Sequence, residues 1–192
     1  MSNRNIIKLD MLIGNRDVAS PTTFEVRDPG RLTELVGVVS AGTAADVDAA
    51  VNAAHQAFLS WREMSVQERL ACLAAAADAL ENEAPALAEL LVREQGMLMR
   101  DTQRDVNNGI KSLREMSDLA EAFLAPEVFE DGEALVRVEK APRGVVAAIV
   151  PWNAPMGLTM GKVGPALATG NTLVIKPSAF APLAVSRALK TI

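Results

Sequence analysis

The sequence predicts an α/β protein in which a parallel βαβ unit follows a helical amino-terminal layer and a β-hairpin. Two continuous apolar runs, at 144–150 and 171–175, flank a stretch of helical length, and such runs are typical of parallel strands covered on both faces. Helical apolar spacing behind capping signals fills much of the first 125 residues. An Asp131-Gly132 turn between two short arms indicates the hairpin.

Length and composition describe a globular chain. The 192 residues suffice for one domain or slightly more, with 49% apolar and 22% charged residues. The net charge of −5, with Lys and Arg spread along the chain, argues against nucleic acid and membrane surfaces as partners. A single cysteine, no visible signal-peptide pattern and a longest apolar run of about half a membrane span predict a cytoplasmic location.

The amino-terminal part begins with short strands and turns. Apolar clusters that end in turn-forming residues predict strands within 11–15 and 23–30. Thr43 followed by Asp46 resembles a capping box, and helical spacing of apolar residues continues after it. A first helix is therefore expected from this point.

Further helices complete the layer. Ser65 and Glu68 form a clear S-x-x-E box that opens a second helix, and we expect Pro85 to break that helix. The helix that follows stops at Gly96, and residues 104–123 are expected to form one more helix.

Polar side chains follow both predicted strands of the βαβ unit. Pro151, Trp152 and Asn153 come after the first strand, and Lys176 and Ser178 come after the second. Parallel strands joined by a right-handed crossover end at the same edge of the sheet, where open α/β sheets bind ligands. An indole, an amide, an ammonium and a hydroxyl are therefore expected at one crevice.

These residues alone leave the ligand of the crevice open. Asn153 can stabilise an oxyanion or bind a carbonyl, Lys176 can bind ribose hydroxyls or phosphate, and Ser178 can be a donor or a helix cap. Neither G-x-G-x-x-G nor a P-loop is present. The alternative is structural, with the Trp152 indole packed under the crossover helix and the Asn153 amide bonded to local backbone.

The segment 142–182 resembles the aldehyde dehydrogenase superfamily. Its motifs are a P-x-G-V-V strand, a P-W-N-x-P corner, a K-x-x-P-A-L-A-x-G-N crossover and a K-P-S strand end. The segments "LIGN", "VRDPG" and "VREQG" resemble the family's amino-terminal region more loosely. The resemblance implies a Rossmann-like dinucleotide-binding fold that is incomplete in this chain.

The same resemblance divides the chain into three parts. Residues 1–125 would be the amino-terminal strands and helical layer of the cofactor-binding domain, 126–141 a hairpin of the oligomerisation sheet, and 142–192 the truncated first part of the dinucleotide-binding core. It implies a homo-oligomer, either a dimer or a tetramer, and an aldehyde as the small-molecule substrate.

The resemblance also implies residue roles. Asn153 looks like the amide that holds the aldehyde-derived oxygen of a cysteine thiohemiacetal, and Lys176 like the lysine that bonds the adenosine ribose. Lys162 resembles a proton-relay lysine of some members, the alternative being a solvated or ion-paired helix lysine. The residues expected at the cofactor are Val150, Pro151, Trp152, Asn153, Lys176, Pro177, Ser178 and Ala179.

Ala179 departs from the pattern of many members that prefer NAD. Those members carry Glu three residues after the strand-end lysine, where its carboxylate takes the ribose hydroxyls and repels a 2′-phosphate. Without this negative charge the local barrier to NADP disappears. The expected cofactor is therefore NAD or NADP.

The family's nucleophilic thiol, glutamate base and glycine-containing loop have no counterpart here. The only thiol, Cys72, lies in an Ala-rich helical stretch and is expected to be a buried core residue. His55 is expected at the surface or core edge, and no cluster has metal-ligand spacing. We expect the chain to be inactive alone, the alternatives being a catalytically dead dinucleotide-binding module and an interaction or structural fragment.

Overall fold

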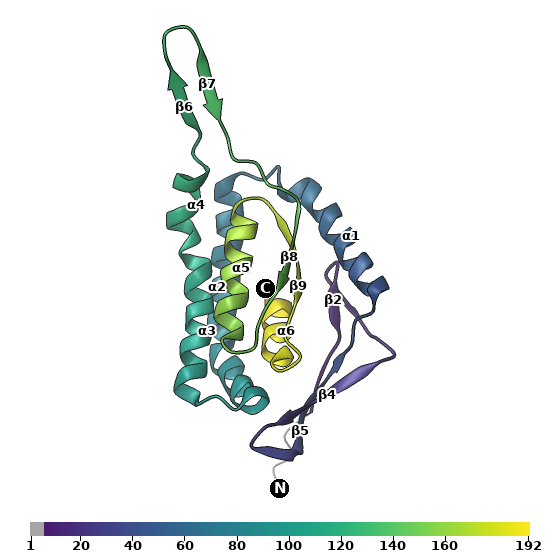
Figure 1. The fold of residues 1–192 in the computed structure, drawn as a ribbon. Helices are drawn as coiled ribbons and strands as arrows, with labels where there is room; N and C mark the ends of the chain where they lie inside the picture. The colour runs from purple at the N-terminus through teal and green to yellow at the C-terminus, as the bar shows by residue number, and fades with distance from the viewer. Residues whose placement is uncertain (1–5) are drawn as a thin grey trace.

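The computed structural model describes residues 6–192, so the amino-terminal segment in which no signal peptide is expected lies partly outside the described residues (Figure 1). Residues 6–40 form two small sheets. In one, β2 (Met11–Ile13) pairs antiparallel with β3 (Arg16–Val18). In the other, β5 (Arg31–Ser40) lies between β1 (Ile7–Leu9), which is parallel to it, and β4 (Thr23–Asp28), which is antiparallel.

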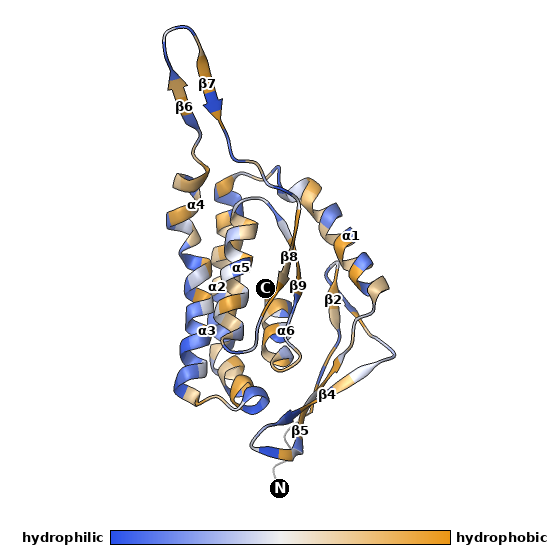
Figure 2. Cartoon of the chain, viewed as in Figure 1, coloured by the Kyte–Doolittle hydropathy of each residue, from blue (hydrophilic) through white to orange (hydrophobic). Residues whose placement is uncertain are grey.

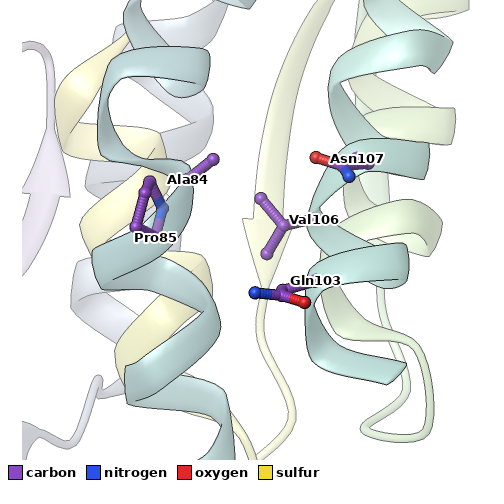
Figure 3. A pocket seen from close by; sticks show the side chains of 5 residues that line it. All are labelled: Ala84, Pro85, Gln103, Val106 and Asn107. Atoms are coloured by element: carbon purple, nitrogen blue, oxygen red, sulfur yellow. The ribbon is translucent and has the colours of Figure 1, made fainter. Parts of the chain in front are cut away.

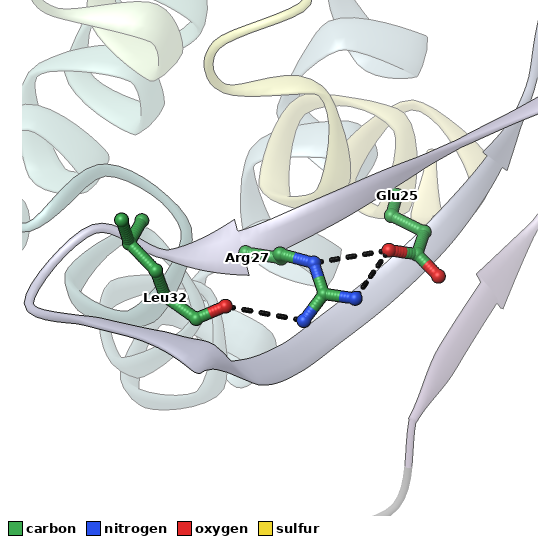
Figure 4. Close-up of polar contacts among 3 residues, drawn as sticks. All are labelled: Glu25, Arg27 and Leu32. Carbon is green, nitrogen blue, oxygen red and sulfur yellow. Dashed lines mark hydrogen bonds and ion pairs between the residues drawn. The ribbon is translucent and has the colours of Figure 1, made fainter.

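A side-chain brace holds the β4–β5 hairpin. The Arg27 guanidinium donates from Nε to the Glu25 carboxylate at 3.0 Å and from Nη1 to the Leu32 carbonyl at 3.1 Å (Figure 4). The pairing register shifts beside Arg27, and the brace spans this irregular part of the hairpin. β5 is longer than the short strands that the sequence predicts for this region.

Both predicted capping boxes are present. α1 (Ala44–Trp61) begins after Thr43, whose hydroxyl accepts from the Asp46 N–H at 3.3 Å while the Asp46 carboxylate accepts from the Thr43 N–H at 2.8 Å. Ser65 and Glu68 make the same reciprocal pair, at 3.2 and 2.7 Å, at the start of α2 (Val66–Gln95). These local signals fix both helix starts.

The expected break at Pro85 is wrong, because α2 continues through this residue to Gln95. Leu80, Leu87 and Leu91 on either side of the proline are fully buried. Burial of each such side chain contributes about 1.5–3 kcal/mol, which together outweighs the roughly 3 kcal/mol that an internal proline costs. The helix ends as expected before Gly96, which adopts the left-handed conformation at φ 77°.

The single helix expected over 104–123 is two helices, α3 (Met99–Arg114) and α4 (Met116–Leu124). The crossover helix α5 (Pro155–Ala168) packs closely along both. A Cβ at Gly109 of α3 would lie 3.0 Å from the Met156 carbonyl oxygen, and one at Gly164 would lie 3.1 Å from the Met116 side chain. Small residues therefore let three helices meet at short range.

The predicted hairpin is present and projects away from the helices (Figure 1). β6 (Glu127–Glu130) pairs antiparallel with β7 (Leu135–Val138), and the Asp131 carboxylate accepts from two backbone N–H groups of the turn at 3.0 and 2.9 Å. Every residue of both strands is exposed, including five large apolar ones. They are Val128, Phe129, Leu135, Val136 and Val138. Both strands carry hydrophobic and hydrophilic residues (Figure 2).

The predicted βαβ unit is also present, which confirms the α/β class. β8 (Val145–Ile149) is parallel to β9 (Thr172–Lys176), with α5 as the crossover, and α6 (Pro182–Thr191) follows. α1 covers one face of this sheet, and α5 lies on the other (Figure 1). The Thr172 hydroxyl donates a hydrogen bond to the Ala54 carbonyl at 2.8 Å, and the Trp61 indole N–H donates one to the Leu167 carbonyl at 3.0 Å. These two bonds connect α1 to the βαβ unit.

The buried core is continuous between the helical layer and the βαβ unit. Its largest fully buried side chains include Leu73 and Leu80 of α2, Leu113 of α3, Met156 of α5 and Leu183 of α6. Among residues 6–192, no helix has both the length and the apolar character to cross a membrane.

Candidate functional site

The two strand ends lie side by side, as the sequence predicts. Ile149 and Lys176 are register partners at the carboxyl ends of β8 and β9, and the Val150 N–H donates to the Lys176 carbonyl at 3.2 Å. The Val150 side chain is buried. The chain that follows each strand therefore leaves the same edge of the sheet, where open α/β sheets bind ligands.

The first corner presents its polar group to solvent. Pro151, Trp152 and Asn153 are all exposed. The Trp152 indole lies edge-on to the ring of Phe180, with centroids 6.5 Å apart, rather than under the crossover helix. Within residues 6–192 the Asn153 side chain makes no hydrogen bond. The Asn153 amide is thus not bonded to local backbone in the described chain, and its N–H groups are accessible to a ligand.

The second corner is a tight turn before α6. Lys176 is exposed, and its Nζ lies 3.4 Å from the Pro177 carbonyl oxygen. The Ser178 hydroxyl accepts from the Phe180 N–H at 3.2 Å, and the Ala181 N–H donates to the Ser178 carbonyl at 3.2 Å. The capping position of α6 is Ala181, so Ser178 shapes the turn and does not cap the helix.

Lys162 lies apart from the other predicted site residues. It is exposed on α5, about 12 Å along the helix axis from Ala154 at a rise of 1.5 Å per residue. Ala179, in contrast, is exposed in the turn between Lys176 and α6. The structure therefore brings together the two strand-end corners and leaves Lys162 outside them.

A carboxylate from the helical layer caps α5. Ala154 and Pro155, at the capping and first positions of this helix, offer no side-chain cap. Asp105 of α3 caps the helix instead. Its Oδ2 accepts from the Met156 N–H and its Oδ1 from the Gly157 N–H, both at 2.9 Å. The carboxylate satisfies two N–H groups that α5 cannot bond internally.

The same arrangement occurs at α6. Ala181 and the proline after it give no side-chain cap, and Glu94 of α2 accepts from the Leu183 N–H at 2.7 Å and from the Ala184 N–H at 2.9 Å. Glu94 is 4% exposed, and burial raises its pKa to about 7 against the opposing effect of the two N–H bonds.

Neither of these helix ends is open to a phosphate. An uncapped helix N-terminus binds anions through its unpaired N–H groups, but Asp105 and Glu94 already use those groups. Burial also raises the pKa of Asp105. Any phosphate at this edge of the sheet must therefore bind through other groups, such as the exposed ammonium of Lys176.

Gln95 links the helical layer to the first corner. Its side-chain amide donates to the Trp152 carbonyl. Pro29, Glu94, Gln95, Trp152 and Phe180 line a pocket of about 260 Å³ at this place. A second pocket, of about 220 Å³, lies beside Pro85 between α2 and α3 and contains no charged side chain (Figure 3). Only the first of the two adjoins the strand ends.

Sequence reasoning missed four residues here: Glu94, Gln95, Asp105 and Phe180. A signal for two of them was present, because "NAPMG" and "FAPLA" place Ala-Pro where a helix start usually carries Ser, Thr, Asp or Asn. Two uncapped helices require caps from elsewhere in the chain. The sequence does not say which of its carboxylates supply them.

Cys72 is exposed on α2, so the expected buried position is wrong. The buried side of this part of α2 runs through Arg69, Leu73 and Ala77, one turn apart, and Cys72 points away from it. Cys72 lies near the start of α2, about 34 Å along the axis from Gln95, which contacts Trp152. It therefore cannot face Asn153. His55 is exposed and stacks on Phe58, as expected for a surface residue.

Comparison with known proteins points to the same family as the motifs of residues 142–182. The model of the aldehyde dehydrogenase family matches residues 16–192. An aldehyde dehydrogenase of Didymella fabae is 37% identical over 166 residues, which cover 85% of this chain and 33% of that protein. A D-glyceraldehyde dehydrogenase (NADP(+)) of Picrophilus torridus is 33% identical over 170 residues, which cover 88% of this chain and 34% of that protein.

Solved structures show the same similarity. The NADP-dependent glyceraldehyde-3-phosphate dehydrogenase of Bacillus halodurans C-125, complexed with NADP, superposes with a TM-score of 0.90 at 26% identity, over 96% of this chain and 40% of that chain. The chain spans about a third of the length of the curated relatives it matches.

Proposed function

This chain belongs to the aldehyde dehydrogenase family, and we propose that it supplies the oxyanion-binding corner and part of the cofactor site of an enzyme that oxidises an aldehyde to a carboxylic acid. The observation that carries the proposal is the Asn153 amide. It is exposed and without a hydrogen bond in the described chain, beside the end of a parallel strand.

In this proposal Asn153 donates a hydrogen bond to the aldehyde-derived oxygen. When a thiolate adds to the aldehyde carbon, negative charge develops on that oxygen, and a preoriented amide N–H stabilises the charge. Cys72 is not in a position to supply this thiolate, because it lies far along α2 from the corner. The 192 residues alone are therefore proposed to be inactive as an aldehyde dehydrogenase.

The second strand end suits the adenosine side of a dinucleotide. Lys176 offers an exposed ammonium for ribose hydroxyls or a 2′-phosphate, and exposed Ala179 brings no carboxylate that would repel the phosphate. Val150, Pro151 and Trp152 follow the neighbouring strand. A nicotinamide cofactor bound here would supply the acceptor for the hydride of the substrate carbon. We propose that both NAD and NADP are used, and the names of the NADP-dependent relatives support this.

Lys162, which we propose as a proton relay, lies about two turns into α5, away from the corners. A homo-oligomer that pairs through β6 and β7 is proposed from their exposed apolar side chains. The division of the chain at 125 and 141 and the cytoplasmic location stay predictions.

The test uses the enzyme that contains these residues, with aldehyde oxidation followed by absorbance of the reduced cofactor. Asn153→Ala is expected to lower kcat about 100- to 1,000-fold, the usual cost of one lost oxyanion donor. Asn52→Ala, an exposed amide on α1, is the matched control and should leave kcat unchanged. An Asn153→Ala enzyme with the parental kcat contradicts the proposal.

The cofactor part is tested by comparing kcat/KM for NAD and NADP in the same enzyme. Values within about a hundredfold of each other are expected, since no acidic residue occupies position 179. An efficiency with NADP thousands of times lower contradicts it. The second candidate function is a nucleotide-binding module without catalysis, which the position of Cys72 favours. Calorimetric titration of both cofactors into the 192-residue chain distinguishes this module, which binds a cofactor, from an interaction or structural fragment, which does not.

A further inference from the structure

The first corner, and Ala154 after it, are not held in place by hydrogen bonds of their own side chains. Ala154 is the capping residue of α5, with φ −149° and ψ 65°, and it makes no side-chain hydrogen bond. Trp152 and Asn153 are exposed, and the indole touches only the ring of Phe180 among the aromatic residues described. An amide that must meet an oxyanion in one orientation needs support from elsewhere.

Two side chains of the helical layer supply that support, one on each side of Asn153. Gln95, the last residue of α2, donates to the Trp152 carbonyl before Asn153. Asp105, in the middle of α3, accepts from the Met156 and Gly157 N–H groups after it. The backbone that carries the Asn153 amide is thus fixed at both ends by neighbouring helices.

The Asp105 contact is closely fitted. A Cβ on Gly157 would lie 3.0 Å from Asp105 Oδ1, and a Cβ on Gly109 would lie 3.0 Å from the Met156 carbonyl oxygen. Asp105 itself is 5% exposed. Two glycines therefore allow the start of α5 to approach α3 closely enough for both carboxylate oxygens to bond.

We propose that Asp105 and Gln95 are positioning residues, which set the direction of the Asn153 amide by fixing the backbone before and after it. This inference rests on the proposed function, because the orientation matters only if Asn153 binds the oxyanion. Neither residue touches substrate in this proposal, and both act through the corner.

The positioning itself is tested without catalysis, in the 192-residue chain labelled with 5-fluorotryptophan. The chain has two tryptophans, Trp152 at the corner and Trp61 in α1, so the fluorine spectrum contains one reporter and one internal control. Trp152→Phe assigns the two resonances. Asp105→Asn places an amide NH₂ against one of two N–H donors, and Gln95→Ala removes the bond to Trp152.

Both variants are expected to shift or split the Trp152 resonance and to leave the Trp61 resonance in place. Asp101→Asn is the matched control, since Asp101 lies one turn earlier on α3 and pairs with Arg100 and Arg104 at the surface. It should change neither resonance. A Trp152 resonance at its parental position in both variants overturns the proposal, as does a shift of equal size for Asp101→Asn.

The second test measures kcat for aldehyde oxidation, in the enzyme that contains these residues. Asp105→Asn is expected to lower kcat about 10- to 100-fold, because a displacement of about 1 Å costs roughly that much. If Asn153→Ala lowers kcat but Asp105→Asn does not, the positioning role is wrong. If Asn153→Ala itself has no effect, the proposed function is wrong, and the fluorine spectra still decide whether Asp105 and Gln95 hold the corner.

Discussion

Glu94 shows how a single buried carboxyl couples stability to pH. Its pKa rises from 4.5 to about 7 on folding, chiefly because burial disfavours the charged form. Between these values the folded chain binds more protons than the unfolded chain, so the free energy of unfolding falls as pH rises. The contribution is complete below about pH 4.5 and is lost as pH passes 7. Burial raises the pKa of Asp105 as well, which adds a contribution of the same sign.

Glu94→Gln removes the titration and keeps the shape of the side chain. At about 1.4 kcal/mol for each pKa unit, the parental chain should lose up to about 3 kcal/mol relative to Glu94→Gln between about pH 5 and pH 8. Urea unfolding at several pH values in this range measures the difference. If the free energies of unfolding of the two proteins change equally with pH, Glu94 does not titrate in this range.

At the scale of elements, α2 is the helix on which the site depends. It runs past Pro85 and ends at Glu94 and Gln95, which hold the second and the first corner respectively. The proline has no N–H for the carbonyl of Glu81, four residues earlier. Pro85 is exposed beside an open pocket, so its ring contributes little to packing.

Pro85→Ala should therefore stabilise the chain. The restored helical hydrogen bond outweighs the greater freedom of the unfolded chain, and we expect a net gain of about 1 kcal/mol. The urea midpoint measures it, with Asn82→Ala on the same exposed turn as the control. Equal or lower stability would show that the contacts of α2 require the distortion that the proline imposes.

Local signals were enough to predict most elements, and distant contacts were not. The helix starts at Thr43 and Ser65 depend on residues three positions away, and the βαβ strands on their own apolar runs, so the sequence contains each of these directly. The caps from Asp105 and Glu94 join residues 51 to 90 positions apart, and no local pattern specifies them. Pro85 misled because burial along a whole helix outweighs one local penalty.

At the scale of the molecule, residues 6–192 combine a well-packed helical layer with exposed apolar surfaces. Within the part of the chain that the structure describes, the β8–β9 sheet has two strands, and the β6–β7 hairpin projects away from the helices (Figure 1). Phe129 and Val136 are directly opposite each other on the hairpin and are 57% and 51% exposed. A two-stranded ribbon is marginally stable alone, and apolar pairs of this kind are typical of a contact surface.

Phe129→Glu is accordingly expected to weaken the self-association that we propose. Burying one such aromatic ring contributes about 1.5–3 kcal/mol, so the dissociation constant of the oligomer should rise about 10- to 100-fold. Analytical ultracentrifugation over a range of concentrations measures it. Leu32→Glu, which places the same charge on an exposed leucine of β5, is the control. An oligomer that tolerates Phe129→Glu as well as Leu32→Glu does not form through the hairpin.

The caps supplied by Asp105 and Glu94 are synthesised before the helices that they cap. Each carboxylate precedes the helix that it caps, so a ribosome completes α2 and α3 before α5 and α6 emerge. The finished layer can then act as a template on which the later helices start, one at Asp105 and the next at Glu94. A circular permutant that begins at the βαβ unit reverses this order, and its α5 and α6 would leave the ribosome before either cap exists.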